Sequence, residues 1–211
     1  MKKIAWFALM MAVTPAFAND FYYEEYASPS MYDNYVGLRL HKNERISYAF
    51  DRRNGSGTTL KDDNVGWGVY IGNRLTDFLK LEFETMYTGV DDTKRGLNFD
   101  FDIWANMVNV HLFKNYGGAV EPYAGIGLGF STIWSSVQGW GYDAADTTFD
   151  LSYSIMAGVN FALNERIDLN LGFKYIKYGD ADHKSASNIF ATTDVDATEF
   201  YLGAAYKFGL K

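Results

Sequence analysis

The chain has 211 residues, a formal net charge of -7, and 18% aromatic residues. The length allows one sizeable domain or two small ones. The acidic balance argues against nucleic acid as a partner, and the absence of cysteine excludes disulfides, a thiol nucleophile and a cysteine-built zinc site. With 20 glycines and only 3 prolines, the composition favours a protein of many strands.

The first 18 residues have the pattern of a secretory signal peptide. Lys2 and Lys3 precede an apolar run from Ile4 to Val13, and Ala16-Phe17-Ala18 forms an A-x-A cleavage site. The apolar run is too short for a helix that spans a bilayer, and no other stretch of the chain is long and apolar enough. We therefore predict an exported protein in which residues 19–34 form a polar periplasmic lead-in.

The remaining chain alternates between apolar and small or charged residues, which is the period of a β-strand. Alternation in the first segment continues to Phe50, which allows that strand to project beyond a membrane. In the fourth segment the apolar parity changes near Ile103 and Trp104. This change indicates either a bulge or an upper half that stands above the lipid, where alternation relaxes. The eight predicted strands are residues 35–42, 65–72, 78–88, 99–112, 122–134, 149–161, 167–178 and 198–208.

The connections between these strands alternate in length. Short turns follow the second, fourth and sixth strands, and longer loops are predicted at residues 51–64, 91–96, 135–148 and 179–197. Membrane barrels have this pattern of periplasmic turns and extracellular loops. A soluble eight-stranded barrel would turn its large apolar residues inward, whereas the set expected inside here is small or charged. We predict an all-β fold, an eight-stranded antiparallel up-and-down transmembrane β-barrel over residues 35–211.

The last predicted strand has an apolar face that ends in aromatic residues. It resembles the C-terminal signal by which bacterial outer-membrane barrels are recognised for insertion, although Gly209-Leu210-Lys211 follows where Phe is usually the last residue. The resemblance implies the barrel insertion machinery as a partner. The residues assigned to this signal are Phe200, Leu202, Tyr206 and Phe208.

Three stretches carry a wider resemblance: EPYAGIGLG at residues 121–129, AGVNFALN at 157–164 and LGFKYIKYGDA at 171–181. They resemble the small outer-membrane β-barrel proteins of the opacity-protein and porin-like group of Gram-negative bacteria. The resemblance implies this fold, a place in the outer membrane, and contact with its lipid and lipopolysaccharide. It implies little about activity, because that group contains adhesins, small pores and proteins with no assigned role.

Charged residues expected to point into the barrel are the main candidate site. Two pairs are expected to be neighbours, Lys174 with Glu199 and Asp168 with Lys207. Because a buried charge must be paired or solvated, the set either fills the lumen with salt bridges or forms a gate on a narrow ion path. The full set is Arg39, Glu82, Glu84, Asp168, Lys174, Glu199 and Lys207.

Two other patterns have residue types that can carry chemistry. His183 and Ser185, with Glu199, resemble the His-x-Ser arrangement of outer-membrane lipid A deacylases, but the Asn that follows the Ser there is displaced to Asn188. Acidic residues near the loops could bind a hard cation, yet their spacing matches no calcium loop. We predict no catalytic residue, metal or cofactor. The acidic residues are Asp143, Asp146, Asp180, Asp182, Asp194 and Asp196.

Aromatic residues near the strand ends are predicted to form two belts at the membrane interfaces. The outer belt comprises Trp67, Tyr87, Trp134, Tyr153, Tyr175 and Phe200; the periplasmic belt comprises Tyr35, Phe78, Phe113, Phe161, Tyr206 and Phe208.

Three functions follow from the sequence. The first is a surface-exposed barrel with a structural or adhesive role, which has at most a narrow pore and could bind a host or surface ligand through its loops. The second is a small porin, and the third is a lipid A-modifying acyl hydrolase.

Overall fold

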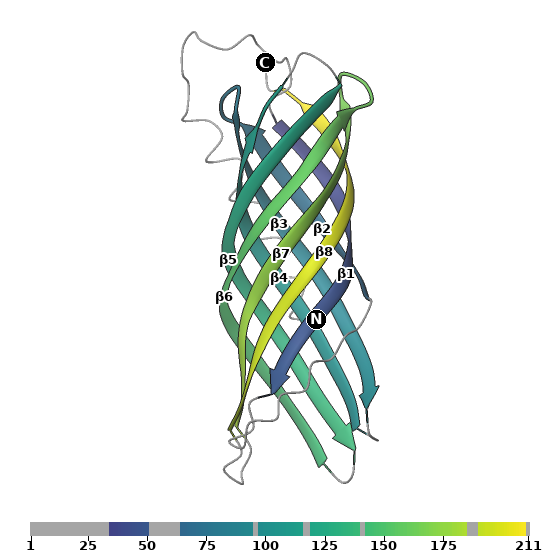
Figure 1. Cartoon of the computed structure of the whole chain (residues 1–211), viewed down its shortest axis with the longest axis vertical. Coiled ribbons are helices and arrows are strands. Elements are labelled where there is room, and N and C mark those ends of the chain that lie inside the picture. Colours follow the sequence, from purple (N-terminus) through teal and green to yellow (C-terminus); the bar gives the residue numbers. More distant parts are fainter. Residues whose placement is uncertain are drawn as a thin grey trace. The chain divides into compact units, whose positions relative to one another are not determined.

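The computed structural model describes residues 34–50, 64–94, 97–115, 119–139, 142–184 and 190–209. They form a closed barrel in which each strand pairs antiparallel with the next and β8 pairs with β1 (Figure 1). The predicted fold class is therefore confirmed. The strands are β1 (Asn34–Phe50), β2 (Asn64–Arg74), β3 (Leu79–Lys94), β4 (Leu97–Phe113), β5 (Val120–Gly139), β6 (Tyr142–Ala162), β7 (Ile167–Lys184) and β8 (Phe190–Phe208).

Alternation along the strands separates an apolar outer face from a polar interior. Leu38, Ile126 and Leu202 are exposed on the outside, whereas Arg39 and Glu84 are buried inside. Large apolar side chains on the outside suit a barrel that stands in lipid. Within the described ranges, no helix is long and apolar enough to cross a membrane.

Both ends of the barrel chain and the short connections lie at one end, which we call the turn end. The β2–β3, β4–β5 and β6–β7 connections are there, and they include residues 75–78 and 163–166. The opposite, loop end carries the connections after β1, β3, β5 and β7. The turn end is uppermost in Figure 1. Residues 1–33 lie outside the described residues, so the signal peptide and most of the lead-in stay predictions.

The strands are longer at the loop end than the sequence suggested. Most residues of the loops predicted at 91–96, 135–148 and 179–197 belong to strands. In the second of these loops, for example, β5 extends to Gly139 and β6 begins at Tyr142. Their Asp, Ser and Thr residues have a loop-like composition, but pairing across each hairpin satisfies the backbone groups that face the partner strand. Since roughly 9–11 residues cross a bilayer, the 20 residues of β5 and 21 of β6 are more than crossing requires.

Of the two explanations for the parity change near Ile103 and Trp104, the bulge is wrong. β4 pairs with β3 and β5 without a register shift, and Phe101 and Ile103 lie inside the barrel on the same face as Asn109. The apolar parity changes because the interior itself becomes apolar toward the loop end.

Two register irregularities occur on other strands. One lies between Asn43 and Arg45, where β1 pairs with β8, and the other between Lys177 and Gly179, where β7 pairs with β8. Gly179 has a φ of 120°, in the left-handed region that glycine adopts without a steric penalty. The second irregularity therefore coincides with a glycine, the residue type that this backbone conformation favours.

Candidate functional site: the filled lumen

The centre of the lumen is held by Arg39 of β1 and two glutamates of β3. Arg39 Nη1 donates to Glu82 Oε1 at 3.0 Å and to Glu84 Oε1 at 2.7 Å, and Nη2 donates to Glu82 Oε2 at 3.3 Å. The Tyr70 ring of β2 lies 4.1 Å from the guanidinium carbon. All four side chains are buried. The structure thus brings together the three charges that alternation assigned to the interior.

The neighbours predicted on β7 and β8 are adjacent but bond elsewhere. Lys174 and Glu199 are Cα partners, yet Lys174 Nζ donates to Glu84 Oε2 at 2.7 Å. Glu199 instead accepts from Tyr178 Oη at 2.6 Å and lies 3.0 Å from His41 Nδ1. Because Lys174 reaches across the lumen from β7 to β3, the network connects separate parts of the barrel wall.

His41 and Asn109 complete this central network. His41 Nε2 lies 3.2 Å from Glu84 Oε1. Asn109 Nδ2 lies 3.3 Å from Glu82 Oε1 and 3.2 Å from Glu84 Oε2. His41 has the same inward parity on β1 as Arg39. Sequence reasoning missed Asn109, although its parity on β4 would have identified it, and it pairs with Glu82 across the sheet. We call Arg39, His41, Glu82, Glu84, Asn109, Lys174 and Glu199 the charge network.

A second group of charges lies near the turn end. Arg74 Nη2 donates to Glu121 Oε2 at 2.6 Å, Lys80 also pairs with Glu121, and the Phe113 ring lies within cation–π distance of both cations. Sequence reasoning missed Glu121 because the predicted strand began at Pro122. The predicted neighbours Asp168 and Lys207 form a separate ion pair of 2.8 Å.

Four lumen tyrosines each cover the glycine that pairs with them directly across the sheet. A Cβ added to any of these glycines would overlap the tyrosine ring, so glycine is needed for the close approach. Two of the four tyrosines also contact each other: the Tyr201 hydroxyl lies 2.5 Å from the Tyr123 hydroxyl, which accepts a hydrogen bond from Asn170 Nδ2. The pairs are Tyr35–Gly72, Tyr70–Gly37, Tyr123–Gly158 and Tyr201–Gly172.

Two residues of the predicted periplasmic belt therefore belong to the lumen. Tyr35 covers Gly72 and donates to Glu82 Oε2 at 3.4 Å, and Phe113 is buried between Arg74 and Lys80. Both have the inward parity of their strands, Tyr35 with Arg39 and Phe113 with His111, so alternation contradicted the assignment. In contrast, Phe78, Phe161 and Tyr206 are exposed on the outside.

The outer belt lies on the outer face. Trp67, Tyr153 and Phe200 are exposed, and the rings of Trp67, Tyr87 and Trp104 contact one another with centroids 6.1–6.2 Å apart. Among the residues predicted to form the insertion signal, Phe200, Leu202 and Tyr206 are also exposed outward. Recognition by the insertion machinery stays a prediction.

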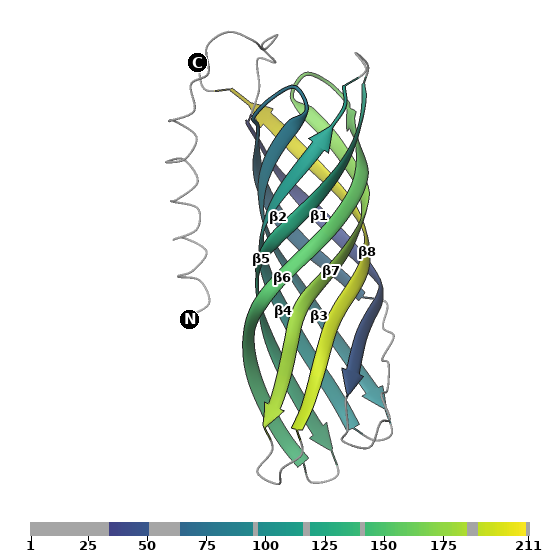
Figure 2. The same ribbon diagram turned by 60° about the vertical axis from the view of Figure 1, so that its left-hand side comes forward.

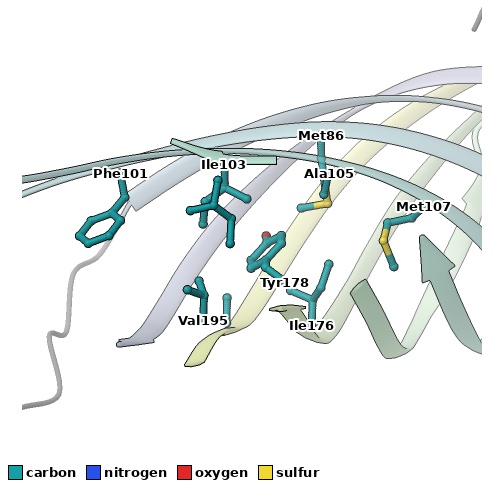
Figure 3. Packing of buried hydrophobic residues seen from close by; sticks show 10 residues of the cluster. Met86, Phe101, Ile103, Ala105, Met107, Ile176, Tyr178 and Val195 are labelled. Atoms are coloured by element: carbon teal, nitrogen blue, oxygen red, sulfur yellow. The ribbon is translucent and has the colours of Figure 1, made fainter. Parts of the chain in front are cut away.

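An apolar cluster fills the lumen on the loop-end side of the charge network (Figure 3). The next inward residue toward the loop end is Met86 after Glu84, Ile176 after Lys174, and Ala197 before Glu199. Within the described residues, the interior therefore changes from charged to apolar in one step along each of these strands. The apolar cluster comprises Met86, Phe101, Ile103, Ala105, Met107, Ile133, Ile176, Tyr178, Val195 and Ala197.

The residues of the other candidate sites lie mostly outside the part of the chain whose side chains the structure describes. Glu199 is buried in the charge network, Ser185 and Asn188 lie outside the described residues, and the side chain of His183 is not among those described. The described residues also contain no group of three or more His, Asp or Glu side chains that could hold a metal ion. Of the acidic residues weighed for a cation, only Asp146 and Asp196 have described side chains.

The described strands thus form a closed eight-stranded barrel with an apolar exterior and an interior filled by the charge network and the apolar cluster. The model of the outer membrane protein beta-barrel domain matches residues 5–208. The chain belongs to the outer membrane β-barrel family. It is therefore a protein of the bacterial outer membrane, in contact with lipid, and its turn and loop ends are the periplasmic and extracellular ends.

Solved structures of outer membrane barrels show the same fold. Neisserial surface protein A is 18% identical, with a TM-score of 0.58 over 83% of this chain and 97% of that chain. OprG of Pseudomonas aeruginosa is 15% identical, with a TM-score of 0.56 over 85% and 98%. Ail, the attachment invasion locus protein of Yersinia pestis, is 12% identical, with a TM-score of 0.51 over 84% and 99%. No curated protein sequence matches this chain.

Proposed function

We propose that this outer membrane barrel presents its extracellular loops on a scaffold that does not conduct solutes, in a structural or adhesive role. The observation that supports this most is that two successive levels of the lumen are filled. Glu84 and Lys174 in the charge network are each 0% exposed, and so are Phe101 and Ile176 in the apolar cluster.

The two levels oppose ion passage by different physical means. In the charge network, Glu84 already bonds Arg39 and Lys174, so an ion could pass only by breaking pairs and leaving charges unpaired in a buried site. In the apolar cluster, an ion would have to shed its water without receiving replacement ligands. Neither level favours a small porin.

Planar-bilayer recording of the purified full-length protein tests this proposal against the porin alternative. We expect no unitary conductance from the wild-type barrel. Reproducible conductance steps would overturn the closed scaffold and favour the porin. If such steps occurred and Arg39→Ala left them unchanged, the charge network would not be their gate.

The adhesive role is supported by the position of the loops and by analogy with Ail, which is named for attachment and was solved with the heparin analogue sucrose octasulfate. The present chain carries a net charge of -7, and a polyanion is poorly matched to an acidic surface. We therefore expect its surface ligand to be neutral or basic rather than sulfated.

Adhesion can be tested with cells of a non-adherent bacterial strain that display the protein. We expect them to bind a host-cell layer, and we expect replacement of residues 51–63 by a Gly-Ser linker to reduce binding without changing surface expression. Soluble heparin should not compete. Binding that heparin abolishes would contradict the charge argument, and absence of binding would favour the structural role alone.

A further inference from the structure

The hydrogen-bonded ladder between β6 and β7 ends before either strand does. The last pair toward the loop end is Tyr153 with Lys177, although β6 extends to Tyr142 and β7 to Lys184. Every residue of both strands lies within the described part of the chain, and they form no ladder pair beyond that point. The wall of the barrel therefore has a seam at the loop end.

The strands on either side of the seam remain paired to their tips. On one side, β3 to β6 form a continuous sheet that reaches Lys94–Leu97 and Gly139–Tyr142. On the other, β7, β8 and β1 form a sheet that reaches Lys184–Phe190 and Phe50–Thr193. We call these the first and second leaf. Figure 2 shows β7 and β8 running together to the loop end.

Side-chain packing, rather than a ladder between β6 and β7, joins the leaves across the interior. Phe101, Ile103 and Ile133 of the apolar cluster come from the first leaf, and Ile176 and Val195 come from the second. In Figure 3, Phe101 and Ile103 lie opposite Val195 and Ile176. Because apolar packing is non-directional, it can hold two leaves together while their spacing changes.

Two aspartates cap the β6 edge that faces the seam. The Thr147 amide donates to Asp146 Oδ1, and the Leu151 amide donates to Asp150 Oδ1, each at 2.7 Å. Alternate residues of a strand direct their backbone groups to the same side, so these two amides share one edge. The Leu163 amide, which has the same odd parity, donates to the Ile167 carbonyl of β7 at 2.9 Å, so the Thr147 and Leu151 amides are on the side of β7.

The foot of the seam is fixed by contacts that are not ladder pairs. Ser152 Oγ donates to the Tyr178 carbonyl at 3.0 Å. The register irregularity between Lys177 and Gly179 lies beside it, and the Asp150 side chain occupies the space that a Cβ on Gly179 would need. The Asp150 cap, Gly179 and the register irregularity therefore all lie within a few residues of the last β6–β7 pair.

We propose that the seam is a built-in line of flexion, about which the two leaves move relative to each other, and that Asp146 and Asp150 keep the β6 edge from pairing with β7. Capped edge donors are unavailable for strand pairing. Movement of the leaves would change the distance between the Gly139–Tyr142 tip and the Lys184–Phe190 tip without breaking a backbone ladder. This property does not depend on whether the loops bind a ligand.

Amide hydrogen exchange, measured by NMR on the full-length protein in lipid nanodiscs, tests the seam. We expect the amides of Thr147 and Leu151 to exchange at least about tenfold faster than that of Thr148, which faces β5 at the same height. Equal protection of all three amides would overturn the seam. This comparison uses the wild-type protein and does not depend on a variant folding.

Substitution of both aspartates tests the caps. In D146V/D150V, we expect exchange at Thr147 and Leu151 to slow by about tenfold, because the freed donors can pair with β7. D146N/D150N is the matched control, since an amide oxygen retains the acceptor and removes only the charge, and we expect wild-type exchange. No slowing in the valine variant, or equal slowing in both variants, would overturn the assignment of the caps.

Spin labels test the movement of the leaves. We expect a broad distance distribution between labels at Ala145 and Asp194, on opposite sides of the seam, because Asp194 pairs with Asp180 of β7 beyond Lys177. Labels at Asp100 and Ala145, both in the first leaf, should give a narrower one. D146V/D150V should narrow the first distribution. Equally narrow distributions in the wild-type protein would overturn the line of flexion.

Discussion

At the scale of single residues, Glu84 contacts three basic side chains, more than any other acidic residue in the described lumen. It contacts Arg39, Lys174 and His41, so removing its charge leaves two buried cations without their shared partner. We expect Glu84→Gln to lower the free energy of unfolding by about 3–5 kcal/mol, measured by urea titration of the protein in lipid or detergent.

The ion pair at the periplasmic end supplies the control. Asp168 and Lys207 are about one-fifth exposed, and water screens a pair of this kind. Asp168→Asn should cost about 0–1 kcal/mol. Equal losses in the two variants would mean that burial does not set the energy of these contacts.

The cross-strand pair of Gly172 and Tyr201 gives a second residue-scale prediction. A methyl group on Gly172 would overlap the Tyr201 ring, which is buried and hydrogen-bonded to Tyr123. We expect Gly172→Ala to cost about 1–3 kcal/mol from overpacking. The same change in a Tyr201→Ala background should cost almost nothing, and a double-mutant cycle by urea titration would show the coupling. Additive effects would contradict it.

At the scale of strands, the β5–β6 hairpin extends beyond the length that crosses a bilayer. Thr147 and Ala157 are both exposed on the outer face of β6, but Ala157 lies near the periplasmic end and Thr147 toward the extracellular tip. We expect Thr147→Cys to react with a membrane-impermeant maleimide on intact cells, and Ala157→Cys to remain unlabelled. Labelling of both would place the lipid boundary elsewhere.

Strand pairing also shows where a local sequence pattern misleads. Residues 135–148 contain Ser, Gly, Asp and Thr, which are typical of loops, yet they form the paired tips of β5 and β6. Local composition indicates the conformation that an isolated segment prefers. A hairpin, however, continues as long as its two strands pair with each other.

At the scale of the whole barrel, the two filled levels of the lumen act as seals in series. We expect Arg39→Ala/Glu84→Ala to remain closed because the apolar cluster is intact, and Phe101→Ala/Ile133→Ala to remain closed because the charge network is intact. The variant with all four changes should conduct ions in planar bilayers. Conduction by the first variant alone would show that the apolar cluster does not seal the lumen.

The sequence by itself determined the number of strands, their antiparallel order and the inward parity of Arg39, Glu82 and Glu84. This was possible because side-chain direction in a strand depends only on odd or even position. It also placed Lys174 beside Glu199, since neighbouring strands joined by one hairpin have nearly fixed register.

Only the tertiary structure decided which of these groups bond. Lys174 reaches Glu84 on a distant strand, Phe101 and Ile103 face an apolar part of the interior, and the ladder between β6 and β7 ends at Tyr153. These features depend on distances across the closed barrel and on where a ladder stops. Alternation along a single strand contains no information about either.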